Sequence, residues 1–215
     1  DNLGPDYNNE GEPDESLSYL DAVALWQAHQ AKRQAILFAS TWQLNPADHP
    51  TRAMTLDGDA VTADFFPMFD VPFRFGGGWT ADEDAHHADV AVISHNLNDM
   101  LFSGQNSVGR EIRLDGQLFR VIGVLDDWNP RPRFFDIGSH GTVYNFDDAG
   151  DVYIPFARAT DMKKDSKFVF CPTASRRSDT SHWDAYLHSE CIRIDAWVQL
   201  DTPAEVAHYR EFLHN

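Results

Sequence analysis

The sequence has no apolar run of the roughly eighteen residues that a membrane-spanning helix needs. It also has no charged start followed by an apolar stretch, which is the pattern of a secretion signal. By itself, the chain of 215 residues is therefore expected to be soluble. It begins with Asp1 and not with methionine, so we expect a processed product or an excised piece of a longer protein.

Basic residues are scarce. The chain has 17 lysines and arginines against 34 acidic residues, which gives a formal net charge of −17. Phosphate backbones and anionic lipid headgroups would repel such a chain, so nucleic-acid binding is not expected. Two interpretations of the acidity stay open, namely solubility and a surface that attracts cationic partners or substrates. Only the clustering of the charges in three dimensions separates them.

Cysteine is nearly absent, since only Cys171 and Cys191 occur. They do not form a C-x-x-C redox motif, and no second C-x-x-C or H-x-x-x-H motif accompanies them, so no metal site is expected. In a reducing compartment they would be two ordinary thiols. In an oxidising compartment they are placed to form a disulfide that closes a modest loop.

The common catalytic and nucleotide-binding motifs are missing as well. The sequence contains no G-x-S-x-G, H-E-x-x-H, S-x-x-K, Walker or dinucleotide-binding motif. Glycines 76–78 are followed by the acidic residues 82–84 and by no Lys-Ser or Lys-Thr pair, so a flexible turn is predicted in place of a phosphate cradle.

The histidines give no better indication of a reactive site. His86 and His87 are adjacent and lack the spacing of metal ligands. His182 and His188 lie near Glu190, but ten histidines in an acidic chain produce such neighbours by chance. We therefore expect a non-catalytic protein without a metal or cofactor.

The most strongly patterned part of the chain begins near Ala88. Val90 to Ile93 is an unbroken apolar run, which predicts a strand buried on both faces. Ser94 is suited to cap a short helix that Ser103-Gly104 would end. The apolar spacing of that helix is carried by Leu97, Met100 and Leu101.

A hairpin is predicted directly after this helix. Ile112 and Leu114 alternate with polar residues, and Asp115-Gly116 is the dipeptide that a two-residue type I′ turn prefers. Residues 117–125 then return as a second, more apolar strand.

This order of strand, helix, turn and hairpin resembles the periplasmic core domain of MacB-like and FtsX-like ABC transporter permeases. The resemblance covers about residues 16–215 and extends to Thr62–Phe66 before the stretch and Asp151–Pro155 after it. Within the stretch the matching residues are Val92-Ile93-Ser94, Leu101-Phe102, Val108-Gly109, Leu114-Asp115-Gly116 and Val121-Ile122-Gly123-Val124.

The resemblance implies an α+β fold with two subdomains. Residues 16–64 and 150–215 would form a porter-like α/β subdomain from both chain ends, and residues 65–149 an inserted β-rich, sabre-like subdomain. Residues 1–15 are acidic and poor in apolar side chains, so a mobile lead-in is expected. Because the family's domain is periplasmic, the resemblance also favours a disulfide between Cys171 and Cys191.

For function, the resemblance implies a domain between the first and second transmembrane helices of an inner-membrane permease. A cytoplasmic ATPase would drive the permease, and the domain would pass the motion to a periplasmic partner or substrate. Efflux with an adaptor protein, lipoprotein or peptide handling, and stress signalling all occur in this family, and the sequence does not separate them. The acidity favours a cationic cargo, and the isolated domain is expected to be a monomer, with the intact permease a dimer.

Two other classes stay open, namely a free-standing secreted ligand-binding module and a secreted hydrolase with an unfamiliar site. The parent gene separates them from the permease, because the permease requires a transmembrane helix on each side of this segment. A hydrolase should also have a deep pocket with convergent polar groups.

The first third of the chain contains further predicted elements. Ser18 and Asp21 resemble a capping box for a helix that ends near Lys32-Arg33. Strands are expected over residues 35–44 and 51–56, with a turn at Asp57-Gly58 after the second. A short helix near residues 64–69 opens an aromatic cluster that we assign to core packing and not to ligand stacking. The cluster consists of Phe65, Phe66, Met68, Phe69, Phe73 and Phe75.

The last third of the chain also contains predicted elements. Residues 127–150 are loop-rich, and a strand over residues 151–156 should end at Pro155. A helix is expected around Trp183, capped by Asp179 or Ser181, and a strand over residues 192–200. Thr202-Pro203 should begin a helix that reaches Asn215 without a stop signal, so we expect the natural chain to continue.

Overall fold

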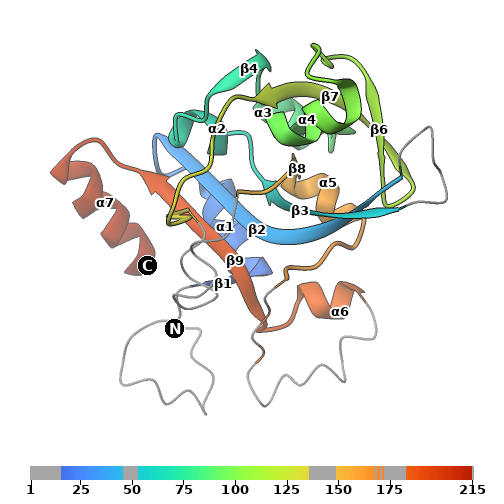
Figure 1. The fold of residues 1–215 in the computed structure, drawn as a ribbon. Coiled ribbons are helices and arrows are strands. Elements are labelled where there is room, and N and C mark those ends of the chain that lie inside the picture. The colour runs from blue at the N-terminus through green and yellow to red at the C-terminus, as the bar shows by residue number, and fades with distance from the viewer. Residues whose placement is uncertain are drawn as a thin grey trace.

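The structure is a computed structural model, and it describes residues 16–45, 53–135, 149–167, 169, 171 and 183–214. Its fold is α+β, as predicted, and its strands form one mixed sheet with several helices around it (Figure 1). The strands are β1 Leu17–Ser18, β2 Arg33–Leu44, β3 Met54–Val61, β4 Phe73–Gly76, β5 Val90–Ile93, β6 Glu111–Leu114, β7 Gln117–Leu125, β8 Val152–Pro155 and β9 Ile192–Gln199. The helices are α1 Tyr19–Ala28, α2 Phe65–Met68, α3 Ala81–Ala85, α4 His95–Phe102, α5 Phe156–Asp161, α6 Trp183–Leu187 and α7 Pro203–His214.

The patterned stretch folds as its sequence predicts. All four residues of β5 are buried, and the hydroxyl of Ser94 accepts a hydrogen bond from the Leu97 N–H at the start of α4. Ser103 then ends α4 in the left-handed conformation. In the hairpin of β6 and β7, Asp115 and Gly116 both have positive φ, as a type I′ turn requires.

The sheet order is β1-β9-β2-β3-β8-β5-β7-β4, and β6 pairs with both β7 and β2. Six strands therefore close on themselves in the order β2-β3-β8-β5-β7-β6. The closing contact uses two backbone hydrogen bonds, from Asn45 to Arg113 at 3.0 Å and from Asp115 to Gln43 at 2.8 Å. Strands from both predicted subdomains thus share one sheet, and the division at residues 64 and 150 stays a prediction.

Two clusters of buried hydrophobic side chains form the core around the sheet. The first contains Phe38, Trp42 and Phe119 from the strands together with Leu97 of α4 and Phe156 of α5. The second contains strand residues such as Leu37 and Tyr153 together with Phe65 and Phe66 of α2. Alternate residues of β5 belong to different clusters, since Ala91 and Ile93 lie in the first and Val90 and Val92 in the second. This alternation explains why the strand is apolar throughout.

The predicted aromatic cluster is core, as expected. Phe65 and Phe66 are buried in the second cluster, and Met68, Phe69 and Phe73 pack against it, whereas Phe75 packs against the first cluster.

The first helix is shorter than its sequence indicates. α1 begins after Ser18 as predicted, but it ends at Ala28, where His29 takes the left-handed conformation, and not near Lys32-Arg33. The side chain of Gln34 explains the early end, because its amide donates to the carbonyls of Leu25 and Trp26 at 2.7 and 3.0 Å. A side chain from β2 thus satisfies carbonyl groups that the next helical turn would have used.

The turn predicted at Asp57-Gly58 is also wrong, since β3 runs straight through both residues. Strand β8 lies directly beside them, and a Cβ at Gly58 would be 2.3 Å from the carbonyl oxygen of Val152. The glycine therefore allows close approach of a neighbouring strand and does not make a turn.

Glycines 76–78 likewise do not form a free turn. Gly76 is the last residue of β4, and a Cβ at Gly78 would lie 2.4 Å from the ring of Phe66.

Other elements were predicted close to their observed bounds. β8 ends at Pro155, β9 and α7 lie where expected, and Thr202 accepts from the Glu205 N–H at the start of α7. The capping residues Asp179 and Ser181, the lead-in 1–15 and most of the loop 127–150 lie outside the described residues. Strands β1 and β4 and helices α3 and α5 are additional elements that the pattern did not indicate.

Candidate binding cleft and disulfide

A cleft of about 600 Å³ lies where three strands of the sheet begin or end. β5 and β7 are parallel, so their carboxyl ends meet at one edge, and β8 is antiparallel to β5 and begins there. The residues just outside these strand ends therefore converge. They are Ser94 and His95 after β5, Asp126 and Asp127 after β7, and Asp151 before β8.

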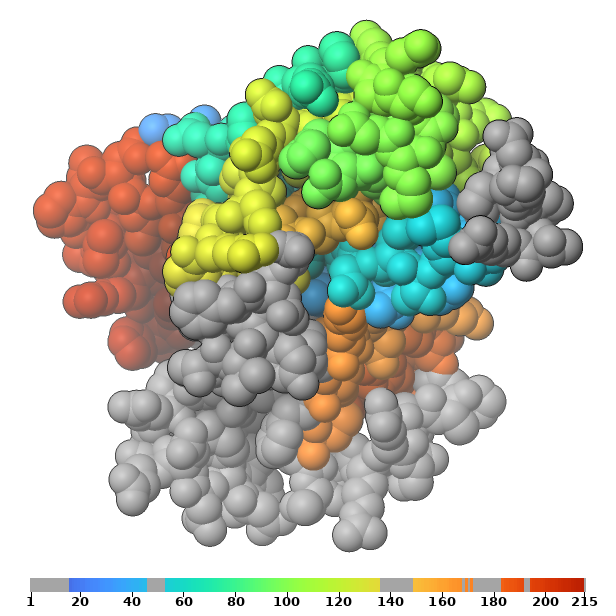
Figure 2. Space-filling view, viewed as in Figure 1, coloured from blue at the N-terminus to red at the C-terminus, as the bar shows by residue number. Residues whose placement is uncertain are grey.

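Backbone hydrogen bonds fix this convergence. The Ser94 N–H donates to the Asp151 carbonyl at 2.9 Å, and the Asp151 N–H donates to the Asp57 carbonyl of β3 at 2.7 Å. The segments that line the cleft come from four distant parts of the chain. Figure 2 shows these parts, coloured green, yellow, orange and cyan, meeting on one face of the molecule.

The cleft is acidic. Among the residues that the structure describes, its lining contains the carboxylates of Asp57, Asp126, Asp127 and Asp151 and no lysine or arginine. Asp57 is paired at 2.5 Å with Lys167, and Asp151 accepts from the Ser94 hydroxyl at 3.1 Å. Carboxylates beside an aromatic ring suit an ammonium or guanidinium group, but a group of acidic residues does not by itself identify a ligand.

Trp128 supplies that aromatic ring, and a buried ion pair lies close to the cleft. The ring of Trp128 stacks on Phe135 with centroids 5.2 Å apart. Between these two residues in the chain, the guanidinium of Arg133 donates to the buried carboxylate of Asp59 at 3.0 Å. Gly150 of the cleft packs directly over Asp59, because a Cβ there would lie 3.0 Å from its carboxylate oxygen.

Tyr153 lies beside this ion pair in the second buried cluster. Burial raises the pKa of its phenol well above the usual value, and the neighbouring charge of Asp59 acts in the same direction. The phenol is therefore neutral at physiological pH and supplies no base for chemistry.

The sequence did not predict that these polar residues meet in a cleft, although their positions at the ends of predicted strands were an indication. Asp126 and Asp127 directly follow one predicted strand, Ser94 directly follows another, and Asp151 is the first residue of a third. The parallel pairing of β5 with β7 and the antiparallel pairing of β5 with β8 could not be read from the sequence, and together they bring the three groups to one edge.

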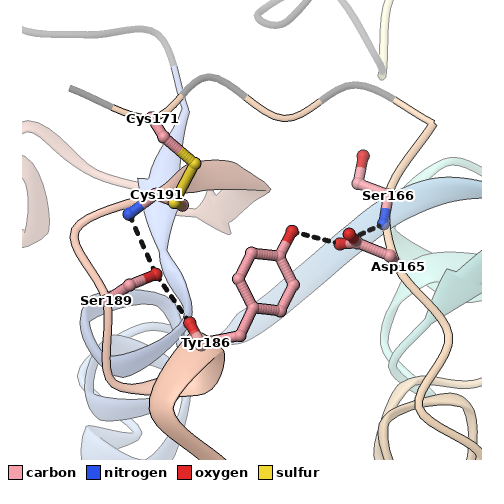
Figure 3. The surroundings of a disulfide bond; sticks show 6 residues. All are labelled: Asp165, Ser166, Cys171, Tyr186, Ser189 and Cys191. Carbon is pink, nitrogen blue, oxygen red and sulfur yellow. Dashed lines mark hydrogen bonds between the residues drawn. A yellow bond between two sulfur atoms is a disulfide. The ribbon is translucent and has the colours of Figure 1, made fainter. Parts of the chain in front are cut away.

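The two cysteines, predicted as the only site residues, are joined in the structure by a disulfide between Cys171 and Cys191 (Figure 3). Cys191 directly precedes β9, and its N–H donates to the Ser189 hydroxyl at 3.3 Å. Ser189 in turn donates to the carbonyl of Tyr186 at 2.6 Å. The Tyr186 hydroxyl donates to the carboxylate of Asp165, so α6 is attached to the segment that leads to Cys171.

That segment is also attached to the sheet. The Lys167 N–H donates to the Ala39 carbonyl at 2.8 Å, and the Ser40 hydroxyl donates to the Asp165 carbonyl at 2.8 Å. β9 pairs with β2 only up to Leu37, so residues 165–167 lie beside β2 just beyond the end of β9. The disulfide therefore connects two segments that both bond to β2.

Reduction of this disulfide should lower the free energy of unfolding by about 3 kcal/mol, because the open chain gains loop entropy when it unfolds. Chemical denaturation of the protein with and without reductant measures the difference. Thiol titration of the denatured, unreduced protein should find no reactive cysteine, and two reactive thiols would show that the bond does not form. A Cys171→Ser/Cys191→Ser variant should match the reduced protein and should not respond to reductant.

The histidines show no catalytic or metal-binding arrangement among the described residues. His86 lies 3.3 Å from Asp82, and His87 lies 2.5 Å from Asp161 of α5. The ring of His188 contacts the carbonyl of Asp184 at 2.7 Å, whereas His182 is outside the described residues. No group of three or more metal-ligating side chains occurs in the part of the chain that the structure describes.

None of the helices in the described ranges is both long and apolar enough to cross a membrane.

The fold is similar to that of known extracytoplasmic transporter domains. The extracellular domain of the noncanonical ABC-type transporter YknZ from Gram-positive bacteria superposes with a TM-score of 0.56 at 12% identity, covering 96% of this chain and 84% of that one. The periplasmic region of MacB from Actinobacillus actinomycetemcomitans gives a TM-score of 0.52 at 14% identity, with 96% and 87% coverage.

Sequence comparison agrees with this similarity. The macrolide export ATP-binding/permease protein MacB of Syntrophobacter fumaroxidans (strain DSM 10017 / MPOB) is 34% identical over 65 residues, which are 30% of this chain and only 9% of that relative. The sequence model of the protein family described as MacB-like periplasmic core domain matches residues 4–211. The chain therefore belongs to the MacB-like periplasmic core domain family.

Proposed function

We propose that this chain is the periplasmic domain of an inner-membrane ABC transporter permease, located between the first and second transmembrane helices. An ATPase in the cytoplasm moves those helices, and the domain transmits the motion to a periplasmic partner or substrate. The observation that carries this proposal is the family match over residues 4–211, together with the transporter-domain fold.

The connection between the first and last elements supports the mechanical role. β1 pairs with β9, and α1 packs against β9 and β2, so the first elements of the described chain contact its last strand, from which α7 continues. In Figure 1, α7 turns back after β9, and the chain end marked C lies on the side of the picture that shows β1. A displacement applied at either end is therefore transferred to the same sheet.

The test uses the full-length parent protein in a membrane, with a spin label at Met100→Cys. Met100 is an exposed residue of α4, and the two cysteines of this chain are joined in their disulfide. Distances between labels on the two copies of a dimer should change between the nucleotide-free and ATP-trapped states. A second label at Leu213→Cys in the same chain serves as the control, because the distance from Leu213 to Met100 within a rigid domain should stay constant.

Two results would contradict the proposal. One is a label distance between copies that does not respond to ATP although the ATPase is active. The other is a parent gene that encodes no transmembrane helix on either side of this segment, as expected for a free-standing secreted module.

The acidic cleft supports a cationic or peptide cargo as the finer part of this proposal. A trilysine peptide serves as the probe, with its affinity measured by calorimetry at low and physiological salt. An Asp126→Asn/Asp127→Asn variant should bind the peptide at least several-fold more weakly than the unsubstituted chain does. Asp82→Asn/Glu83→Gln removes the same charge from α3 and should leave the affinity unchanged, and equal losses in both variants would refute binding in the cleft.

A further inference from the structure

The carboxyl group of Asp84 bonds to Trp79, which lies just before its own helix, and to Ala63 in a separate segment of the chain. It lies on α3, and the residue is only 2% exposed, although Asp82 on the same short helix is exposed. One carboxylate oxygen accepts from the Ala63 N–H at 2.6 Å, just before α2. The other accepts from the indole N–H of Trp79 at 2.9 Å.

These bonds hold one wall of a second groove, which has a volume of about 610 Å³ and runs between α2 and residues 78–81. Trp79 is buried and packs edge-on against Phe66, with ring centroids 4.8 Å apart. Gly78 allows this approach because any side chain there would collide with Phe66. A movement of Trp79 away from α2 would therefore widen the groove and expose the ring of Phe66.

The charged groups nearest to Asp84 are acidic. Asp64 lies at the start of α2 and Glu83 precedes Asp84 on α3, and both disfavour a second negative charge. No lysine, arginine or histidine in the described residues forms an ion pair or hydrogen bond with Asp84.

The basic side chains next to α3 and on the helix packed against it have other partners. His86, which caps the C-terminus of α3, lies against Asp82, and His87, the next residue, lies against Asp161 of α5. Arg158 of α5 donates to Asp89 at 2.6 Å. An ionised Asp84 would therefore be a buried negative charge without a cation to balance it.

We propose that Asp84 is a pH-dependent latch, which holds α3 and Trp79 against α2 in acidic solution and releases them, opening the groove, as the solution becomes neutral. The latch depends on burial. In the closed form the neutral carboxyl group is favoured, whereas in an opened form water solvates the carboxylate and it ionises readily. Opening therefore releases a proton, and a rise in pH favours it.

The pH range follows from the two forms of the group. Burial raises the pKa of Asp84 from 3.8 to about 7, more than its two hydrogen bonds lower it. At a pH between these two pKa values the closed form binds a proton that the open form has lost, so the equilibrium constant for opening increases with pH. With these values it increases about 50-fold from pH 5 to pH 7 and levels off above pH 7.

Hydrogen exchange of the folded protein tests the latch directly. The amides of Asp84, His86 and Ala88 bond to carbonyls within and beside α3 and report its opening. After correction for the intrinsic exchange rate, their protection should fall about 50-fold from pH 5 to pH 7. The backbone N–H of Asn98, which donates to the carbonyl of Ser94 in the first turn of α4, is the internal reference and should not show this change. Equal pH dependence in α3 and α4 would overturn the proposal.

Two matched variants separate the latch from a general effect of charge. Asp84→Asn cannot ionise, so protection of α3 should become independent of pH, whereas the exposed Asp82→Asn should behave as the parent protein does. An Asp82→Asn variant that also loses the pH dependence would refute the assignment to Asp84. If Asp84→Asn does not fold, the carboxyl carbon resonance of Asp84 in the parent protein decides. A titration midpoint near 7 supports the latch, and a midpoint below 5 overturns it.

Discussion

The free energy of unfolding of an Arg133→Met variant should be roughly 3–5 kcal/mol lower than that of the unsubstituted protein. The side chain of Arg133 is 9% exposed, and its guanidinium donates to the fully buried carboxylate of Asp59 on β3. Methionine fills a similar volume but cannot donate, so the negative charge of Asp59 would lose this guanidinium in an environment that excludes water. Urea denaturation followed by circular dichroism measures the loss.

A double-mutant cycle distinguishes the ion pair from simple loss of packing. Asp59→Asn removes the charge with little change in volume, so Arg133→Met should be much less costly in the Asp59→Asn background than in the parent. Losses that add within about 0.5 kcal/mol would show that the two side chains act independently.

The ion pair also matters for the cleft. Arg133 follows Trp128 by only a few residues, and its guanidinium lies over the ring of Phe135 at 5.3 Å. Asp59 lies next to Gly150, which also lines the cleft. Loss of the pair should therefore loosen the segment of residues 128–135 and weaken trilysine binding without changing any residue that faces the peptide.

Local signals predicted the region from Val90 to Leu125 because each element there is specified within a few residues. The apolar run of β5, the capping Ser94 and the Asp115-Gly116 turn act independently of the rest of the chain. The family resemblance rested on this region, and the comparisons confirm the family.

The same dipeptide at another place shows where local signals fail. Asp57-Gly58 and Asp115-Gly116 are identical, yet only the second pair forms a turn. The first pair lies beside β8, which approaches so closely that only glycine fits. Contacts across almost a hundred residues decide this outcome, and a local pattern contains no information about them. Gln34, which ends α1 from a neighbouring strand, is a second example.

The buried carboxyl groups escaped prediction for a related reason. With 34 acidic residues in the chain, nothing in the sequence distinguishes Asp59 and Asp84 from their exposed neighbours. Asp84 lies in a run of acidic residues that reads as solvent-exposed. Only the position of α3 against Trp79 and Ala63 reveals that this carboxyl group points inward.

Phe65→Ala should lower the free energy of unfolding by roughly 3–5 kcal/mol and should do so in a single transition. Phe65 is completely buried, and among the described residues its ring contacts those of Phe66, Phe69, Trp128, Phe135 and Tyr153. Removal of the ring leaves a cavity at the centre of the second cluster. Phe134→Ala is the matched control, because that ring is 37% exposed and its loss should cost about 1 kcal/mol.

The number of transitions tests the predicted division into two subdomains. Tyr153 belongs to residues 150–215 and Trp128 to residues 65–149, and both rings contact Phe65. The strands of both parts also share one sheet, so neither part can lose its structure without exposing the core of the other. Circular dichroism and tryptophan fluorescence should therefore give the same midpoint in the parent protein, and in Phe65→Ala both should move together. Separate midpoints, of which only one responds to Phe65→Ala, would mean that residues 65–149 unfold as an independent unit.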